Sequence, residues 1–186
     1  HLPFVAPKRF WDLYKDQEIK PLEPRAFPQG AQQYQYSFRE ICAYGMDEGK
    51  LFTPESMPTP AQARDLVHAY YAAASFADAQ AGRILRKLDE LNLRDNTIVV
   101  VWSDHGFHLG EKTHWQKRTL WEECTRVPLI IKPPKDTEIK PGIRTALVEL
   151  IDMRATVEAL TNLEPRHTHF GRSLLPLIAD QTPDHR

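Results

Sequence analysis

This 186-residue sequence has too few cysteines for a disulfide framework and too short apolar runs for a membrane span. Its two cysteines, Cys42 and Cys124, allow one bridge or two free thiols, and the sequence does not decide between them. No stretch comes near the roughly 18 apolar residues that predict a membrane-spanning helix. A disulfide framework and a membrane span are therefore both excluded for this sequence.

An excess of charge of one sign is also missing. Lys and Arg total 24, Asp and Glu total 25, and the basic residues are scattered, so the formal net charge is -1. A broad basic surface for nucleic acid or for an anionic membrane is therefore not available, although a few local cations could hold a small anionic substrate. With 41% hydrophobic and 26% charged residues, the composition is that of a globular domain or of a substantial piece of one.

The beginning of the sequence has neither an initiating Met nor a signal peptide, and it opens on His1-Leu2-Pro3-Phe4. We therefore expect a processed or truncated product. Prolines interrupt residues 1–58, which predicts a mostly irregular segment with at most a short helix at Lys8–Tyr14. Such a segment normally lies on a body that supplies its packing surface, here expected to be an N-terminal part outside this chain.

Regular elements are predicted from residue 59 onward. Thr59 is typical of an N-cap and Pro60 of a first helical position, and apolar residues then recur at steps of three and four. Thr97–Trp102 follows as a largely β-branched run, which predicts a strand covered on both faces. Val127–Ile131 is predicted to be a second strand.

A further helix is predicted at Ala146–Leu163. The order of helix, buried strand, loop, strand and helix indicates an α/β fold. We expect residues 59–135 to carry the first helix, the buried strand and the loop with the chemistry, and residues 136–186 to belong to a smaller C-terminal subdomain.

The predicted buried strand leads directly into Ser103-Asp104-His105-Gly106. In open α/β sheets the active-site groups lie just beyond the carboxyl ends of the strands. Asp104 offers the carboxylate oxygen that a divalent cation prefers, and His105 adds a nitrogen beside it. The ordinary alternative is that Asp104 is a turn residue and His105 a surface histidine.

The residues after this tetrapeptide carry a resemblance to a known family. Leu109-Gly110-Glu111, Trp115 and Lys117 follow at offsets that resemble those of the sulfatase family, whose members have Ser-Asp-His-Gly or Ser-Asp-Asn-Gly after a buried strand. Two further segments resemble iduronate-2-sulfatases in particular. They are His1-Leu2-Pro3-Phe4, similar to part of a Lys-Pro-His-x-Pro-Phe segment, and the run Gly171-Arg172-Ser173-Leu174-Leu175-Pro176-Leu177.

The resemblance implies the C-terminal region of an alkaline-phosphatase-like sulfatase fold, and an enzyme that hydrolyses sulfate esters, expected to be those of sulfated sugars. In that family a formylglycine made from a Cys-x-Pro-x-Arg motif attacks sulfur, while a divalent cation, most often Ca²⁺, polarises the sulfate oxygens. By position, Asp104 and His105 match metal ligands, and Lys117 and His1 match catalytic residues that bind the sulfate. The ordinary alternatives are a solvated cation for Lys117 and a disordered terminus for His1.

Neither cysteine of this chain lies in a Cys-x-Pro-x-Arg motif, and no early Asp-Asp pair completes the metal site. We therefore expect the formylglycine on an N-terminal part of the same enzyme, and we expect this chain alone to be inactive. Lys112 stands where many members of the family have a second histidine, which weakens any prediction of the exact substrate.

Two other functions stay open. One is a metal-dependent phosphatase, phosphodiesterase or phosphonate hydrolase of the alkaline-phosphatase superfamily. The other is a non-catalytic remnant that binds sulfated glycans through Lys117. The expected partners are the N-terminal part and a sulfated carbohydrate, with no nucleic acid and no membrane span. Because full-length members are usually exported or lysosomal, the resemblance implies a periplasmic, extracellular or lysosomal location.

Overall fold

The fold is described from a computed structural model. It describes residues 3–20, 29–30, 40, 45–46, 50–51, 58–137, 139–165, 167–168 and 170–180, with only the backbone at 45–46 and 50–51. The predictions that concern His1 and Cys42 therefore lie outside the described residues.

The chain divides into two compact units. The first consists of His1–Lys87 and His105–Val127, and the second of Leu88–Asp104 and Pro128–Arg186. The three segments predicted from the sequence do not coincide with these units, because each unit is built from stretches that are separated along the chain.

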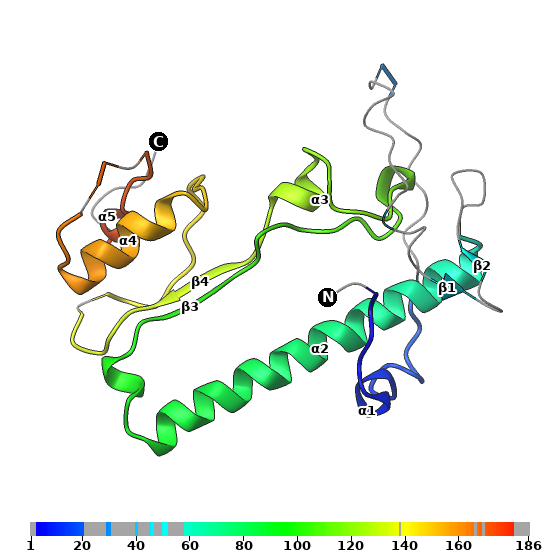
Figure 1. The fold of residues 1–186 in the computed structure, drawn as a ribbon, viewed down its shortest axis with the longest axis horizontal. Helices are drawn as coiled ribbons and strands as arrows, with labels where there is room; N and C mark the ends of the chain where they lie inside the picture. The colour runs from blue at the N-terminus through cyan, green and yellow to red at the C-terminus, as the bar shows by residue number, and fades with distance from the viewer. Residues whose placement is uncertain are drawn as a thin grey trace. The chain divides into compact units, whose positions relative to one another are not determined.

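Helices and strands follow one another as labelled in Figure 1. In chain order they are α1 (Lys8–Trp11), β1 (Gly45–Met46), β2 (Lys50–Leu51), α2 (Pro60–Glu90), the 3-10 helix η3 (Arg94–Asn96), β3 (Val99–Trp102), the 3-10 helix η4 (Glu111–Thr113), α3 (Glu122–Thr125), β4 (Leu129–Lys132), α4 (Asp152–Thr161) and α5 (Leu175–Ile178). No helix in the described part of the chain combines the length and apolar character that a membrane span needs.

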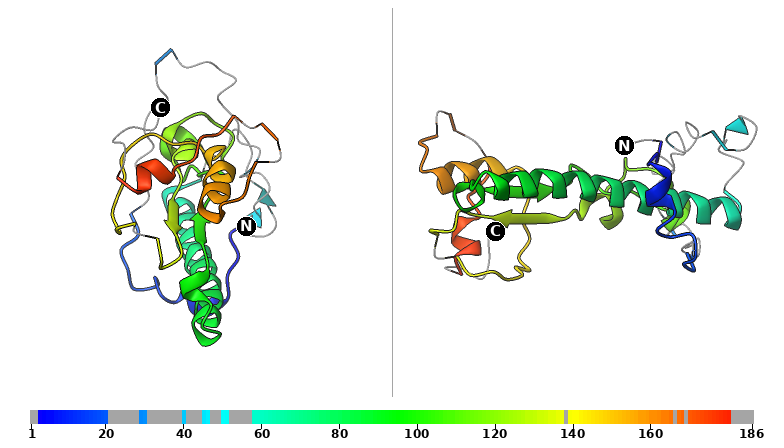
Figure 2. Two further views of the ribbon diagram at one scale, coloured as in Figure 1. Left: turned by 90° about the vertical axis from the view of Figure 1, so that its left-hand side faces the viewer. Right: turned by 90° about the horizontal axis from the view of Figure 1, so that it is seen from below.

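Helix α2 is the longest element and runs as one rod in both views of Figure 2. The Thr59 hydroxyl accepts a hydrogen bond from the Gln62 amide at 3.3 Å, and the Gln62 side chain accepts one from the Thr59 amide at 2.9 Å. This reciprocal pair is a capping box, so the predicted start of the helix is confirmed. The helix ends at Glu90, and Asn92 then leaves the helical region with φ 54°.

The N-terminal segment packs on α2 of the same chain. Phe10 is buried, and the Tyr14 hydroxyl lies 2.6 Å from that of Ser75. The imidazole of His68 contacts the Trp11 carbonyl at 2.8 Å and stacks on the Trp11 ring with centroids 3.6 Å apart. Part of the packing surface for the α1 region is therefore supplied by α2, and packing of residues 1–58 on a part outside the chain stays a prediction.

Strand β3 pairs antiparallel with β4, in a register that runs from Val99 opposite Lys132 to Trp102 opposite Leu129. Val101 and Trp102 expose 43% and 55% of their surface. The prediction of a strand covered on both faces is thus wrong for this chain. An apolar run shows only that a strand can be buried. Here the pairing with β4 occupies one edge of β3 and leaves its faces open.

Two buried side chains join α4 to the segment before α5. The Asp152 carboxylate accepts hydrogen bonds from the amides of Glu149 at 3.0 Å and Arg172 at 2.9 Å. The Thr156 hydroxyl donates to the Asp152 carbonyl at 2.7 Å and accepts from the Leu174 amide at 2.9 Å. Helix α4 begins at Asp152 rather than at residue 146 as predicted, because Glu149 and Asp152 are bonded to each other in a turn that precedes the helix.

Candidate functional site

The two residues predicted to bind metal follow β3 directly. The Asp104 side chain is exposed and that of His105 is half-buried, with its Nδ1 2.8 Å from the Gly106 carbonyl oxygen. Asp104 is the last residue of the stretch Leu88–Asp104 in the second unit, and His105 is the first residue of the stretch His105–Val127 in the first unit. Among the described residues, no three His, Cys, Asp or Glu side chains gather closely enough to hold an ion. A carboxylate and an imidazole are donor types that divalent cations bind, and a metal site at Asp104 and His105 stays a prediction.

The loop from His105 to Val127 folds back on itself in the first unit. Its two arms are joined by three backbone hydrogen bonds of 2.8 to 2.9 Å: Gly106 N to Cys124 O, His108 N to Gln116 O, and Gly110 N to His114 O. The approach at the first of these is close. A Cβ on Gly106 would overlap the Glu123 carbonyl oxygen and lie 3.2 Å from the Cα of Cys124. Only glycine fits at this position.

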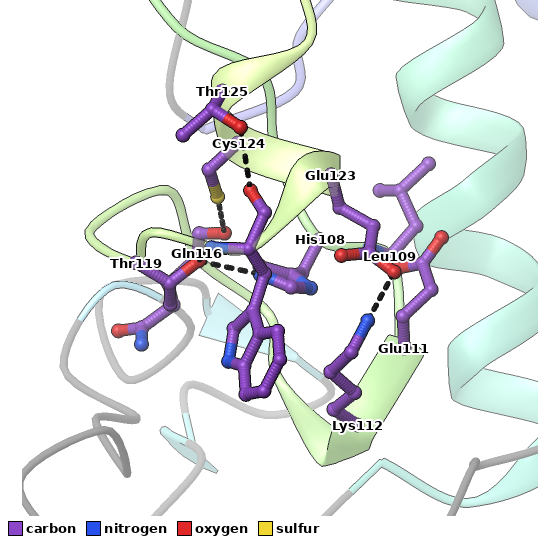
Figure 3. A network of polar contacts seen from close by, with 10 residues as sticks. His108, Leu109, Glu111, Lys112, Gln116, Thr119, Glu123, Cys124 and Thr125 are labelled. Atoms are coloured by element: carbon purple, nitrogen blue, oxygen red, sulfur yellow. Dashed lines mark hydrogen bonds and ion pairs between the residues drawn. The ribbon is translucent and has the colours of Figure 1, made fainter.

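The tip of the loop holds a strained turn. Lys112 and Thr113 have φ values of 51° and 62°, a region that is unusual for a β-branched residue such as Thr113. The Lys112 ammonium pairs with the Glu123 carboxylate on α3, and Glu111 Oε2 accepts a hydrogen bond from the Leu109 amide at 2.6 Å (Figure 3). Backbone strain of this kind persists only where surrounding contacts fix it, and it gathers at functional sites.

A buried polar cluster lies behind this turn. His108, His114 and Gln116 are fully buried, and the two imidazole centroids are 5.1 Å apart. His108 Nε2 lies 2.8 Å from the Thr119 hydroxyl, as Figure 3 shows. Among the described residues, the side-chain amide of Gln116 has no hydrogen-bond partner.

Burial also keeps both imidazoles neutral. Burial, together with the nearby His108 and Lys112 and against an opposing effect of Glu123, lowers the pKa of His114 to about 4 from an ordinary value of 6.5. Burial lowers the pKa of His108 in the same direction, with Glu123 opposing the change. The pKa of Glu123 is also lowered, because its hydrogen bond and ion pair with Lys112 outweigh the effect of burial.

We therefore expect the full-length protein to lose stability as the pH falls from about 6.5 to about 4. The unfolded chain binds a proton at His114 near pH 6.5, whereas the folded chain binds it only near pH 4. The loss from this residue is at most about 3 kcal/mol. Urea unfolding at pH 7 and pH 4.5 measures it. His114→Gln should reduce the difference between the two pH values, and His167→Gln, at an exposed histidine, should leave it unchanged.

Lys117 lies in the same loop as His105 and is held by Glu40. The Lys117 amide donates to Glu40 Oε2 at 2.9 Å, and its ammonium lies 3.4 Å from Glu40 Oε1. Its side chain is 29% exposed, so it is not the fully solvated cation of the ordinary interpretation. Arg118 is the next residue, which gives the loop two neighbouring cations.

Sequence reasoning missed the carboxylates that hold this loop. Glu40 is 77 residues away from Lys117, and Glu123 is 11 residues away from Lys112. Neither separation is a helical or strand spacing, so no periodic signal joins the partners. A pairing that depends on tertiary folding alone leaves no local pattern in one sequence.

Comparison with known proteins decides the family. Residues 12–163 match the sulfatase family. The chain belongs to the sulfatase family. It is 31% identical to a sulfatase of Formosa agariphila, over 96% of this chain and 34% of that protein, and 32% identical to human iduronate 2-sulfatase, over 96% and 32%. The chain thus spans about a third of the length of the curated relatives that it matches.

The sulfatase chain also matches solved structures. The phosphonate monoester hydrolase from Silicibacter pomeroyi superposes on 98% of it, and on 36% of that hydrolase, with a TM-score of 0.74 and 28% identity. The predicted α/β, alkaline-phosphatase-like sulfatase fold is therefore confirmed.

Proposed function

We propose that the full-length protein containing this sulfatase chain hydrolyses the sulfate esters of sulfated sugars, in the manner of an iduronate-2-sulfatase. The observation that carries the proposal is Lys117. It is a partly buried ammonium, fixed by a carboxylate, in a loop of the family-matched region that follows the end of a sheet strand. A fixed cation of this kind stabilises the charge that grows on a transferred sulfate group. The sugar substrate is supported by the likeness to human iduronate 2-sulfatase.

The residues of this chain would divide the work between binding and catalysis. Lys117 would bind a sulfate oxygen, and Arg118 would add positive potential beside it. Asp104 and His105 would contribute two ligands to a divalent cation, for which Ca²⁺ is the expected ion. When bound, that cation would polarise the sulfate oxygens. His1 is proposed to contact the sulfate as well, on the resemblance of the opening tetrapeptide alone.

The remaining machinery is proposed to come from an N-terminal part of the same enzyme that carries the formylglycine. Two observations support this partner. The chain corresponds to about a third of its relatives, and the strand that precedes Asp104 leaves Val101 and Trp102 exposed. Apolar strand faces of this kind are normally covered in an α/β sheet. By resemblance to full-length members of the family, the enzyme is proposed to be exported or lysosomal.

Phosphonate monoester hydrolysis is the second candidate, because the hydrolase from Silicibacter pomeroyi shares this fold at 28% identity. The experiment is a comparison of initial rates. The full-length protein is offered a disaccharide with a 2-O-sulfated iduronate, one with a 6-O-sulfated glucosamine, and an aryl phosphonate monoester, each with Ca²⁺ and after chelation. We expect sulfate release to exceed phosphonate hydrolysis and to stop on chelation. Faster hydrolysis of the phosphonate than of either sulfated disaccharide would overturn the proposal of sulfatase activity.

A further inference from the structure

Glu40 is a nearly buried carboxylate that no sequence pattern singled out. Its side chain is 11% exposed, and it comes from a different part of the first unit than the loop that it contacts. Carboxylates are rarely so well covered unless they are paired. The partners of Glu40 are therefore informative about its role.

The two oxygens of Glu40 bind two groups of the same residue. Oε2 accepts the Lys117 amide at 2.9 Å, and Oε1 faces the Lys117 ammonium at 3.4 Å. The guanidinium of Arg118 is farther from Oε1, at 3.9 Å, and its side chain is 71% exposed. A long lysine side chain loses much rotamer freedom when it is fixed. Because Glu40 holds both ends of Lys117, it fixes the backbone and the charged group together.

An ordinary surface ion pair would look different. The exposed pair of Glu122 and Arg126 in the same loop has side chains 72% and 81% exposed, and the Glu122 carboxylate contacts the guanidinium of its partner rather than the backbone amide. Pairs of that kind contribute little. Glu40 differs because its side chain is much less exposed. It also accepts a charge-assisted hydrogen bond from a backbone amide, which is a stronger and more directional contact.

We propose that Glu40 is the positioning residue for Lys117, so that the ammonium is already oriented before an anionic sulfate group arrives. The contribution of this positioning to catalysis rests on the proposed function. Glu40 does not touch the substrate in this scheme. With Lys117 and Arg118 it forms a group of two cations and one carboxylate, which keeps one net positive charge for the anion. Preorganised cations of this type bind a charged group without reorganising.

The test compares Glu40→Ala and Glu40→Gln with Glu122→Gln in the full-length protein. Glu40→Ala should raise KM for the sulfated disaccharide about fivefold, because one net hydrogen bond that orients the cation is lost. Glu40→Gln keeps an acceptor for the Lys117 amide and should fall between Glu40→Ala and the unchanged protein. Glu122→Gln should leave KM unaltered. A simple loss of folded protein would lower kcat and would not raise KM.

A second readout does not depend on activity. The acylation rate of Lys117 by an acetyl N-hydroxysuccinimide ester, followed by peptide mass spectrometry, should rise in Glu40→Ala and stay constant in Glu122→Gln. Unchanged KM and unchanged acylation in Glu40→Ala would overturn the proposal. If the unaltered protein releases no sulfate and acylation still rises, the positioning of Lys117 stands and the proposed function fails.

Discussion

Replacing Lys117 with Met in the full-length protein is expected to lower kcat/KM for a sulfated sugar by about 10²- to 10³-fold, the usual effect of removing a group that stabilises transition-state charge. The Lys117 ammonium is partly buried and oriented by Glu40, so its charge acts in a less screened setting than that of a surface lysine. Steady-state kinetics with the sulfated disaccharide measures the effect.

Arg118→Met is the matched control for this substitution. It removes the neighbouring cation, whose side chain is 71% exposed and 3.9 Å from Glu40. We expect a change below about tenfold, since exposed charges act mainly through a screened potential. Equal losses in the two variants would show that general positive potential, rather than a positioned ammonium, assists the reaction.

Replacing Gly106 with Ala is expected to destabilise the loop that carries Lys117 by about 3 kcal/mol, at the upper end of overpacking effects. The added Cβ would overlap the carbonyl oxygen of Glu123, and backbone atoms cannot move away as the end of a side chain can. The hydrogen bond between the Gly106 amide and the Cys124 carbonyl, 2.8 Å long, joins the two arms and would be strained. Urea unfolding of the full-length protein at pH 7 measures the loss.

Gly82→Ala serves as its control. A Cβ there would meet only the end of the Arg86 side chain, at 3.4 Å, within helix α2. Alanine in a helix interior is favoured over glycine by about 0.5–1 kcal/mol, so this variant should be slightly more stable. Stability of Gly106→Ala equal to that of the unaltered protein would contradict the close approach.

Local signals in the sequence predicted the elements that depend on short-range chemistry. The start of α2 was predicted from Thr59 and Pro60, because a capping box is a contact between neighbours. The strand before Asp104 was predicted from its β-branched run. The predicted cover on both faces was wrong for Val101 and Trp102, because the faces of a strand are covered by segments that its own residues do not specify.

The candidate site was predicted in part, for the same physical reason. Asp104, His105 and Lys117 were singled out because they lie in one short run whose spacing resembles a known family, and their roles stay predictions. The residues that fix the run, Glu40 and Glu123, contact it only in the folded chain. The helix predicted to start at residue 146 starts at Asp152 instead, because a turn in which Asp152 and Glu149 bond to each other precedes it.

The most direct test of the central claim is mass spectrometry of the full-length protein from its natural source. If this chain is the C-terminal part of a sulfatase, an upstream peptide will contain the Cys-x-Pro-x-Arg motif with its cysteine converted to the sulfur-free aldehyde, formylglycine. That material will release sulfate from the sulfated disaccharide. A full-length protein in which the motif is absent, or present with an unmodified cysteine and no sulfate release, would contradict the account.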